Sequence, residues 1–275
     1  MKKAIALSMI VIFAVGITAC RSDSANSAEV ETIVITGSTS VEKILNEMKD
    51  EFQALNPDVV IEYTGSGSSA GITDTKAGTN NIGASSRELK NEEKEDTLKS
   101  EVFAFEGIAV IVHPSNQTVS NITEEQLADI YTGKITNWSE VGGRDHEIFV
   151  ISREESSGTK SAFEELVKLG DAGGLGGNAA VLEGNGPVQA AVAGNKNAIG
   201  YVSFSYINDT VKPLRVEGIE PTVDQARSGD YPLSRPFIFC YYDDKVTKAG
   251  KAFLEYAVSE EGQEAVEHQN GIRID

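Results

Sequence analysis

The sequence predicts an α/β protein whose sheets are mixed but mainly parallel, are flanked by helices and form two lobes. Segments with the apolar spacing of strands alternate with segments that have the spacing of helices through most of the chain after residue 28, which is typical of parallel sheets covered by helices. The stretch Glu29–Asp275 is also longer than the chain that usually folds around one small hydrophobic core. Its length therefore favours two lobes over one.

The N-terminal segment is predicted to be removed from the folded protein. Lys2 and Lys3 precede an apolar run over 4–17 that is shorter than the roughly 20 residues a membrane-spanning helix needs. This pattern is typical of a secretory signal peptide, here residues 1–19. The run ends in Ile17-Thr18-Ala19-Cys20, which resembles a bacterial lipobox, so we expect lipid on Cys20 and a polar tether over residues 20–28. The protein would then be extracytoplasmic and anchored to the cell membrane.

Strands are expected where β-branched or continuous apolar residues lie between turn residues, namely over 32–36, 59–63, 102–112, 148–151, 198–203, 212–216 and 236–242. Helices are expected where apolar residues recur at three- and four-residue spacing, namely over 41–55, 70–77, 122–131, 159–169, 247–258 and 260–269. The helix at 122 has Thr123 as a predicted N-terminal cap and acidic residues in its first turn. The glycine-rich segment 171–186 is expected to be a loop, and the charged segment 87–99 a solvated helix face.

Composition restricts the partners. A formal net charge of −18 argues against nucleic acid as a ligand. An anion could still be bound at a buried site, because distant surface charge is screened within about 10 Å. No spaced group of histidines and cysteines indicates a metal, no dinucleotide motif indicates a cofactor, and Cys240 lies in an apolar run where a small buried hydrophobe is expected.

Three turns rich in serine, threonine and glycine each connect a predicted strand to a predicted helix, over 36–40, 64–69 and 152–159. A helix N-terminus carries unpaired N–H groups and a partial positive charge, glycine admits close approach, and hydroxyls both donate and accept hydrogen bonds. Three such turns meeting at one place would form a site for a small oxyanion. Thr39 and Glu42 also have the spacing of a capping box.

Arg153 is the most specific candidate in the third turn. Its planar guanidinium can donate two parallel hydrogen bonds to an oxyanion. A surface ion pair with Glu154 or Glu155 is the alternative use of this side chain. Glu155 could also orient Arg153 and remain its partner when an anion binds.

Six segments of the chain form a recognisable series of motifs: Ser38–Val41, Gly67–Ile72, Ile82–Arg87, Ile130–Trp138, Arg153–Thr159 and Ile199–Ser203. In this order they resemble the motifs of phosphate-binding proteins of ABC importers, over nearly the whole chain after the signal. The resemblance implies a type II periplasmic-binding-protein fold, with two hinge strands within 102–112 and 236–242. It implies one lobe of residues 29–109 plus 236–275 and a second lobe of residues 110–235.

The resemblance also implies which residues bind phosphate: Ser40, Val41, Ser68, Ser86, Arg153, Ser157, Gly158 and Thr159, with Thr39, Ser69 and Arg87 as further candidates and Glu155 as the acidic partner of Arg153. The implied partners are inorganic phosphate and the permease and ATPase subunits of an importer, and we expect a monomer. We expect neither a cofactor nor catalysis.

One position departs from the family pattern. Many members carry aspartate where this chain has Ser86, and that carboxylate accepts a proton from phosphate. A carboxylate rejects fully deprotonated anions, whereas serine does not. Sulfate, molybdate and tungstate therefore stay open as ligands, as does a sensor or adhesin role without transport. A serine hydrolase is a further alternative, because Gly67–Gly71 fits a nucleophile elbow centred on Ser69 and Ser157–Lys160 fits a Ser-x-x-Lys motif.

Overall fold

The structure is a computed structural model, and it describes residues 30–274. The predicted signal peptide (1–19) and the predicted lipidated cysteine and tether (20–28) lie outside the described residues.

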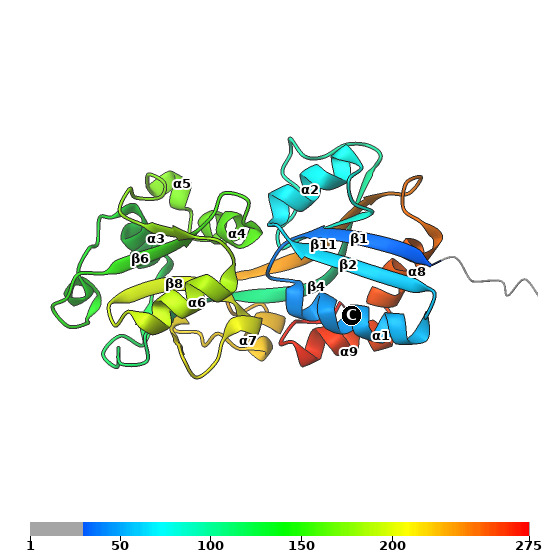
Figure 1. The fold of residues 1–275 in the computed structure, drawn as a ribbon. Helices are drawn as coiled ribbons and strands as arrows, with labels where there is room; N and C mark the ends of the chain where they lie inside the picture. The colour runs from blue at the N-terminus through cyan, green and yellow to red at the C-terminus, as the bar shows by residue number, and fades with distance from the viewer. Residues whose placement is uncertain (1–29, 275) are drawn as a thin grey trace, which may run out of the picture.

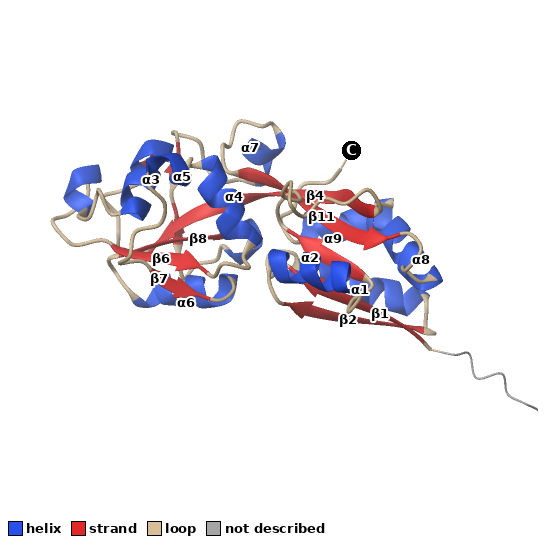
Figure 2. Cartoon of the chain, turned by 90° about the horizontal axis from the view of Figure 1, so that it is seen from above, coloured by secondary structure: helices blue, strands red, loops and turns tan. Residues whose placement is uncertain are grey.

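Two lobes lie side by side and are joined by two long strands, β4 (Leu98–Val112) and β11 (Ser234–Tyr242), which cross from one lobe to the other (Figures 1 and 2). The two strands pair antiparallel, with Glu106 opposite Arg235 and a register irregularity between Phe237 and Ile238. The two-lobe α/β fold with two hinge strands is therefore confirmed.

The main sheet runs in the order β2-β1-β3-β11-β4-β8-β6-β7, with β9 paired to β4. Pairing is parallel among β1, β2 and β3 and among β6, β7 and β8, and it is antiparallel wherever β4 or β11 takes part. The bounds are β1 Glu31–Gly37, β2 Val59–Gly65, β3 Ile82–Ser85, β6 Phe149–Arg153, β7 Ala180–Leu182, β8 Ala198–Ser203 and β9 Lys212–Pro213, and a separate small sheet pairs β5 Asn121–Ile122 with β10 Arg215–Val216.

Helices cover both lobes (Figure 1), and none of those in residues 30–274 is long and apolar enough to cross a membrane. Their bounds are α1 Glu42–Leu55, α2 Ser68–Ala77, α3 Glu124–Thr132, α4 Gly158–Leu166, α5 Leu169–Ala172, α6 Asn185–Gly194, α7 Val223–Arg227, α8 Lys248–Ala257 and α9 Glu260–His268, with 3₁₀ helices η1 Trp138–Val141 and η2 Phe204–Tyr206.

Each lobe has its own hydrophobic core. In the lobe that begins with β1, helix α1 buries the apolar face that its periodicity predicts against the sheet and against α8 and α9. In the other lobe, Tyr131 of α3, Phe163 of α4 and Tyr201 of β8 pack their rings together. Burying a large apolar side chain contributes roughly 1.5–3 kcal/mol to the stability of the folded lobe. Each core therefore stabilises the sheet and helices of its lobe, and these fix the turns that connect them.

Three local predictions were wrong. The segment 87–99 forms turns and the start of β4 instead of a helix, and the segment 171–186 contains β7 and the start of α6. Thr39 and Glu42 do not form a capping box, because the N-cap position of α1 is Val41 and no side chain caps it. The predicted cap at Thr123 is confirmed, and it forms a capping box with Gln126.

Candidate functional site

The three serine-rich turns meet at the interface between the lobes. Ser40, in the turn between β1 and α1, lies 2.7 Å (Oγ to Oγ1) from Thr159 at the start of α4. At the start of α2, the Ser69 N–H donates to the Ser156 carbonyl at 3.1 Å. These contacts join residues more than 80 positions apart in the chain and bring all three predicted turns to one place.

Buried hydroxyls line this meeting point. Ser38 donates through Oγ to Ser86 Oγ at 2.8 Å, and the Ser86 N–H donates to Ser68 Oγ at 3.1 Å. The Ser68 and Ser86 hydroxyl oxygens are 3.3 Å apart. All three serines are buried, so each hydroxyl depends on its neighbours or on a ligand for hydrogen bonds.

The N-terminus of α4 points its first turn at these hydroxyls. The Ser157 hydroxyl caps the helix by accepting from the Lys160 N–H at 3.1 Å. The N–H groups of the residues in a first turn have no acceptor within their own helix, and Gly158 and Thr159 occupy that turn. A Cβ on Gly158 would lie 2.6 Å from Ser86 Oγ, so the absence of a side chain is what lets α4 approach the opposite lobe.

Val41 was among the residues implied to bind phosphate, and its apolar side chain leaves only the backbone N–H for that contact. In this structure that N–H donates to the Ser38 carbonyl at 3.2 Å, which closes the turn ahead of α1. The Val41 side chain is fully buried in the core of its lobe.

Arg153 lies at the end of β6 and is 1% exposed. Its Nε and Nη2 donate to the two carboxylate oxygens of Glu154, each at 2.8 Å. Nη2 also donates to Thr39 Oγ1 in the opposite lobe at 3.2 Å. Nη1 is buried and has no hydrogen-bond partner among residues 30–274. Since a buried donor without an acceptor is costly, this atom is available to donate to a ligand.

The prediction that Glu155 orients Arg153 was wrong, because Glu154 fills that role. The Glu154 carboxylate turns inward and also accepts from the Gly184 N–H at 3.3 Å. Glu155 faces solvent, with 90% of its side chain exposed, and pairs with Lys160 at 2.9 Å. Burial alone would raise the pKa of Glu154, but the hydrogen bonds and charge of Arg153 outweigh burial and hold that pKa below its ordinary value.

Arg87 is neither a solvated residue nor a free cation for the site. It is 5% exposed and binds both carboxylate oxygens of Glu93, each at 2.7 Å. Its Nη2 also donates to Ser69 Oγ at 3.0 Å. Arg87 therefore stabilises the first turn of α2, and both polar groups of Ser69 are used in structural contacts.

Sequence reasoning missed Arg235, which lies on β11 among the hydroxyls and is 3% exposed. Its Nη1 donates to Thr159 Oγ1 at 2.9 Å and to the Ser86 carbonyl at 3.2 Å. Its Nη2 donates to Ser40 Oγ at 3.0 Å and to Ser203 Oγ at 2.8 Å. Arg235 thus contacts the first and the third serine-rich turns, through Ser40 and Thr159, and also Ser86 after β3.

Glu106, on β4, balances the charge of Arg235 at a closest N–O distance of 3.6 Å. The Glu106 carboxylate also accepts from the Ser203 hydroxyl and from the Ser205 N–H, the latter at 3.1 Å. Burial raises the pKa of Glu106, against the effect of Arg235. Burial likewise lowers the pKa of Arg235, to about 10, which leaves the guanidinium charged at neutral pH. The sequence signal was a charged residue within an apolar strand run for Glu106 and directly ahead of one for Arg235.

Asn185, the first residue of α6, was also missed because it lies in the segment expected to be a loop. Its Nδ2 lies 3.2 Å from both Thr39 Oγ1 and Ser40 Oγ, and its Oδ1 accepts from the Ser203 N–H at 3.1 Å. The amide therefore connects the turn ahead of α1 to β8 in the other lobe.

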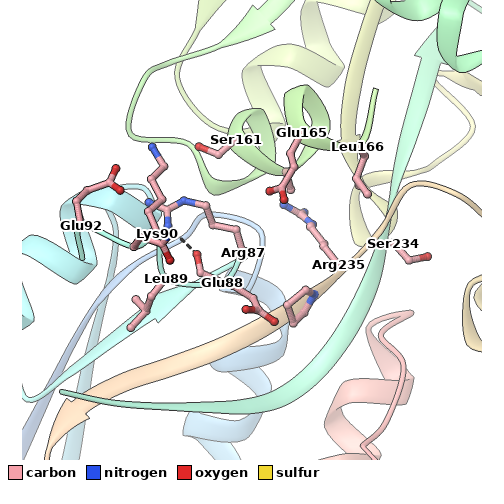
Figure 3. A pocket seen from close by; sticks show the side chains of 13 residues that line it. Arg87, Glu88, Leu89, Lys90, Glu92, Ser161, Glu165, Leu166, Ser234 and Arg235 are labelled. Carbon is pink, nitrogen blue, oxygen red and sulfur yellow. Dashed lines mark hydrogen bonds between the residues drawn. The ribbon is translucent and has the colours of Figure 1, made fainter. Parts of the chain in front are cut away.

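A cavity of about 580 Å³ lies beside the turns, between the segment after β3 and helix α4 (Figure 3). Arg235 forms part of its wall, together with Arg87, Lys90, Ser161 and Glu165. A second cavity, of about 310 Å³, borders Thr39 and Glu154 and is also lined from both lobes. No cluster of three or more potential metal-ligating side chains occurs within residues 30–274.

Comparison with known proteins gives the same assignment from two directions. Residues 22–261 match the PBP superfamily domain. The chain is 31% identical to the phosphate-binding protein PstS of Borreliella burgdorferi, over 90% of this chain and 92% of the relative, and 32% identical to PstS of Bacillus subtilis, over 91% and 83%.

Solved structures agree. A Clostridium perfringens protein assigned as a phosphate ABC transporter substrate-binding protein, solved with bound phosphate, is 43% identical with a TM-score of 0.86, over 89% of this chain and all of that chain. An ABC-type phosphate transport receptor from Vibrio cholerae is 35% identical with a TM-score of 0.75, over 88% and 100%. With two lobes, two hinge strands and three converging turns on the same chain, the protein belongs to the PBP superfamily and, within it, to the family of PstS phosphate-binding proteins.

Proposed function

We propose that this protein binds inorganic phosphate between its lobes and delivers it to the permease and ATPase subunits of an ABC importer. The observation that carries the proposal is the buried Arg153 Nη1, which lacks a partner among the described residues and lies in the third serine-rich turn. A guanidinium N–H and the N–H groups of a helix first turn suit a small tetrahedral anion. The phosphate named for the relatives supports the same ligand.

The proposed contacts come from both lobes. Ser68 and Ser86 would contribute from the lobe of α1 and α2, where Ser40 and Val41 would shape the turn ahead of α1. Arg153, Ser157, Gly158 and Thr159 would contribute from the lobe of α4. Thr39 and Asn185 would position these groups from the rim. We propose lobe boundaries of 29–109 plus 236–275 and 110–235, with hinge bending in β4 and β11. The two separate cores support this division, except that Ile108, Ala109 and Ile272 pack into the core of the second lobe.

Isothermal titration calorimetry with phosphate and sulfate tests the ligand. We expect phosphate to bind with micromolar or tighter affinity and sulfate to bind more weakly. Equal affinity for the two anions would remove phosphate as the named ligand but would leave oxyanion binding intact. Molybdate and tungstate belong in the same series, because Ser86 provides no carboxylate to repel them.

The variant Ser86→Asp sharpens this test. An aspartate here would place a carboxylate beside Ser68 and Gly158, and we expect it to weaken sulfate more than phosphate, because only phosphate has a proton to donate. Ser66→Asp is the matched control, because Ser66 lines the second cavity, outside the network of hydroxyls.

Attachment to the membrane is part of the proposal. Lipid on Cys20 would keep a monomeric binding protein close to the importer. Cys20→Ala should release the protein into the soluble extracytoplasmic fraction, and unchanged fractionation with the membrane would contradict the anchor.

We propose a binding role rather than hydrolysis. Ser69, the serine of the elbow-like motif, accepts from Arg87, and two of the three histidines hydrogen bond elsewhere, His113 to Ser115 and His268 to Glu47. Hydrolysis of an ester that is abolished by Ser69→Ala would contradict this assignment.

A further inference from the structure

The hydrogen bonds of Ser40 decide which way its proton points. A serine hydroxyl has one proton to donate and two lone pairs to accept. Ser40 Oγ lies 3.0 Å from Arg235 Nη2 and 3.2 Å from Asn185 Nδ2, and both of these nitrogens can only donate. With both lone pairs used, the Ser40 proton is directed at Thr159 Oγ1, 2.7 Å away.

Thr159 is constrained in the same way. Its Oγ1 accepts from Arg235 Nη1 at 2.9 Å and, by the previous step, from Ser40. Its lone pairs are then filled and its own proton remains available. Arg235 fills one lone pair of each hydroxyl and Asn185 fills the second lone pair of Ser40, so neither hydroxyl can accept a proton from a ligand.

We propose that Arg235 is a positioning residue that leaves the Ser40 and Thr159 hydroxyls no lone pair for a ligand proton and turns the Thr159 proton toward the ligand, so that the site selects the doubly charged hydrogen phosphate ion over the singly charged dihydrogen phosphate ion. This inference rests on the proposed phosphate-binding function. A singly charged ion carries a second O–H group, which would face a donor instead of an acceptor and would lose a hydrogen bond.

Ser86 fits the same arrangement. At this position the chain offers no carboxylate to accept a ligand proton, and Arg235 Nη1 donates to the Ser86 carbonyl at 3.2 Å. One lone pair of that carbonyl is thus used by a cation, while the Ser86 hydroxyl, which accepts from Ser38, keeps a second lone pair for the single O–H of the doubly charged ion. The site would then distinguish the two phosphate ions by the number of protons they carry, without a carboxylate that accepts a proton.

The position of Arg235 is fixed from several sides. Its guanidinium carbon lies 5.3 Å from the centroid of the Phe237 ring, within the range of a cation–π contact. Ser203 bridges it to Glu106. The charged and titratable groups around Arg235 are Glu106 on β4, Arg153 on β6, Tyr201 on β8 and, around the adjoining cavity, Glu165 on α4 and Arg87, Glu88, Lys90 and Glu92 in the segment after β3.

The test is calorimetry of phosphate binding between pH 5.5 and 8.5. For the wild-type protein we expect the apparent association constant to rise by about tenfold per pH unit below the second ionisation of phosphate and to level off above it. In the double variant Glu106→Gln/Arg235→Met, the freed hydroxyls can turn to accept, and we expect a rise of about threefold per unit or less.

The double variant removes both buried charges together, because removing Arg235 alone would leave Glu106 unpaired in the interior and could prevent folding. Arg235→Lys should keep the steep pH dependence with weaker binding, since an ammonium still donates to the hydroxyls. Glu106→Gln alone should also keep it. If the dependence is lost in Glu106→Gln, titration of Glu106 is its source and the proposal is overturned.

A measurement on the wild-type protein alone needs no variant to fold. Sulfate stays doubly charged over this pH range, so its competition with phosphate should strengthen at pH 5.5 relative to pH 8.5. A flat profile for bound phosphate, or the same slope in the wild type and the double variant, would overturn the role of Arg235. Failure of the wild type to bind phosphate at any pH would instead remove the proposed function, and this inference with it.

Discussion

Arg153 and Thr39 lie in different lobes and are joined by a hydrogen bond from Nη2 to Oγ1 at 3.2 Å. The same guanidinium is held within its own lobe by Glu154, so its planar face is fixed on two sides while Nη1 stays free of partners among the described residues. An anion bound at Nη1 would complete a contact that already spans the interface. Binding and closure of the lobes would then draw on the same residue.

Replacing Arg153 should reduce phosphate affinity strongly. Arg153→Ala removes the guanidinium and its contact with Thr39. A single charged hydrogen bond contributes about 1.5–3 kcal/mol, which corresponds to a roughly 10- to 100-fold change in the dissociation constant. We expect the dissociation constant for phosphate to rise by more than this. Isothermal titration calorimetry measures the dissociation constant of the variant for phosphate. Arg215→Ala is the control, because Arg215 forms an exposed ion pair with Glu220 in the same lobe and should leave the affinity unchanged. Equal affinities for the two variants would contradict the role of Arg153.

Glu154 and Glu155 provide a matched pair for the effect of pH on stability. The pKa of Glu154 is lower in the folded protein than its ordinary value, so its stabilising contribution is present above the unfolded-state pKa and is lost as pH falls through the folded pKa. We therefore expect Glu154→Gln to lower the melting temperature at pH 7 and to lower it less near pH 3.5. Thermal unfolding followed by circular dichroism at both pH values measures this.

Glu155→Gln is the control for that experiment. The Glu155 side chain is exposed and contacts only Lys160 among the ion pairs of residues 30–274, and exposed pairs contribute little. We expect its melting temperature to follow that of the wild type at both pH values. A larger effect at position 155 than at 154 would restore Glu155 as the partner of Arg153.

The fold and the turns could be predicted because local sequence determines them. The apolar face of α1 and the β-branched residues of β1 follow simple periods, and each turn has glycine and hydroxyl residues directly before a helix. The choice between Glu154 and Glu155 could not be predicted this way. It depends on the direction of the chain after β6 and on the Gly184 N–H, which lies 30 positions further along.

Gly158 should be essential for bringing the lobes together. Alanine normally stabilises a helix by about 1 kcal/mol relative to glycine, but here its Cβ would collide with the hydroxyls of Ser68 and Ser86. We expect Gly158→Ala to abolish phosphate binding while the melting temperature without phosphate stays near that of the wild type. Calorimetry and thermal unfolding measure the two effects.

A second helical glycine controls for the change in backbone freedom. A Cβ on Gly194, at the end of α6, would meet no atom of the described chain within 4 Å, so Gly194→Ala should bind phosphate as the wild type does. Binding by Gly158→Ala with wild-type affinity would show that α4 need not approach Ser68 and Ser86.

The buried contact between Arg235 and Glu106 could not be predicted from the sequence. Each is a single charged residue near or within an apolar strand run, and such a residue can face solvent at a sheet edge or lie buried at a site. Only the pairing of β4 with β11, which places the two residues opposite each other, shows that their charges meet in the interior. That pairing depends on segments more than 100 positions apart, so no local pattern contains it.

Tyr206 links the lobes away from the proposed anion, and it should therefore affect affinity through closure alone. Its hydroxyl lies 3.2 Å from the Thr39 carbonyl and 3.2 Å from Glu42 Oε2, both in the opposite lobe. A net hydrogen bond contributes about 0.5–1.5 kcal/mol, so Tyr206→Phe should raise the dissociation constant for phosphate by about 2- to 10-fold without altering the preference for phosphate over sulfate.

Tyr231→Phe is the matched control, because the Tyr231 hydroxyl donates to the Ile108 carbonyl at 2.8 Å, and both residues belong to the core of one lobe. This variant should unfold at a lower temperature and bind phosphate with unchanged affinity, since its lost hydrogen bond is made whether the lobes are apart or together. If Tyr206→Phe behaves in the same way, the contact between Tyr206 and Thr39 does not contribute to closure. If both variants lose affinity equally, general loss of stability, rather than a specific link between the lobes, accounts for the effect.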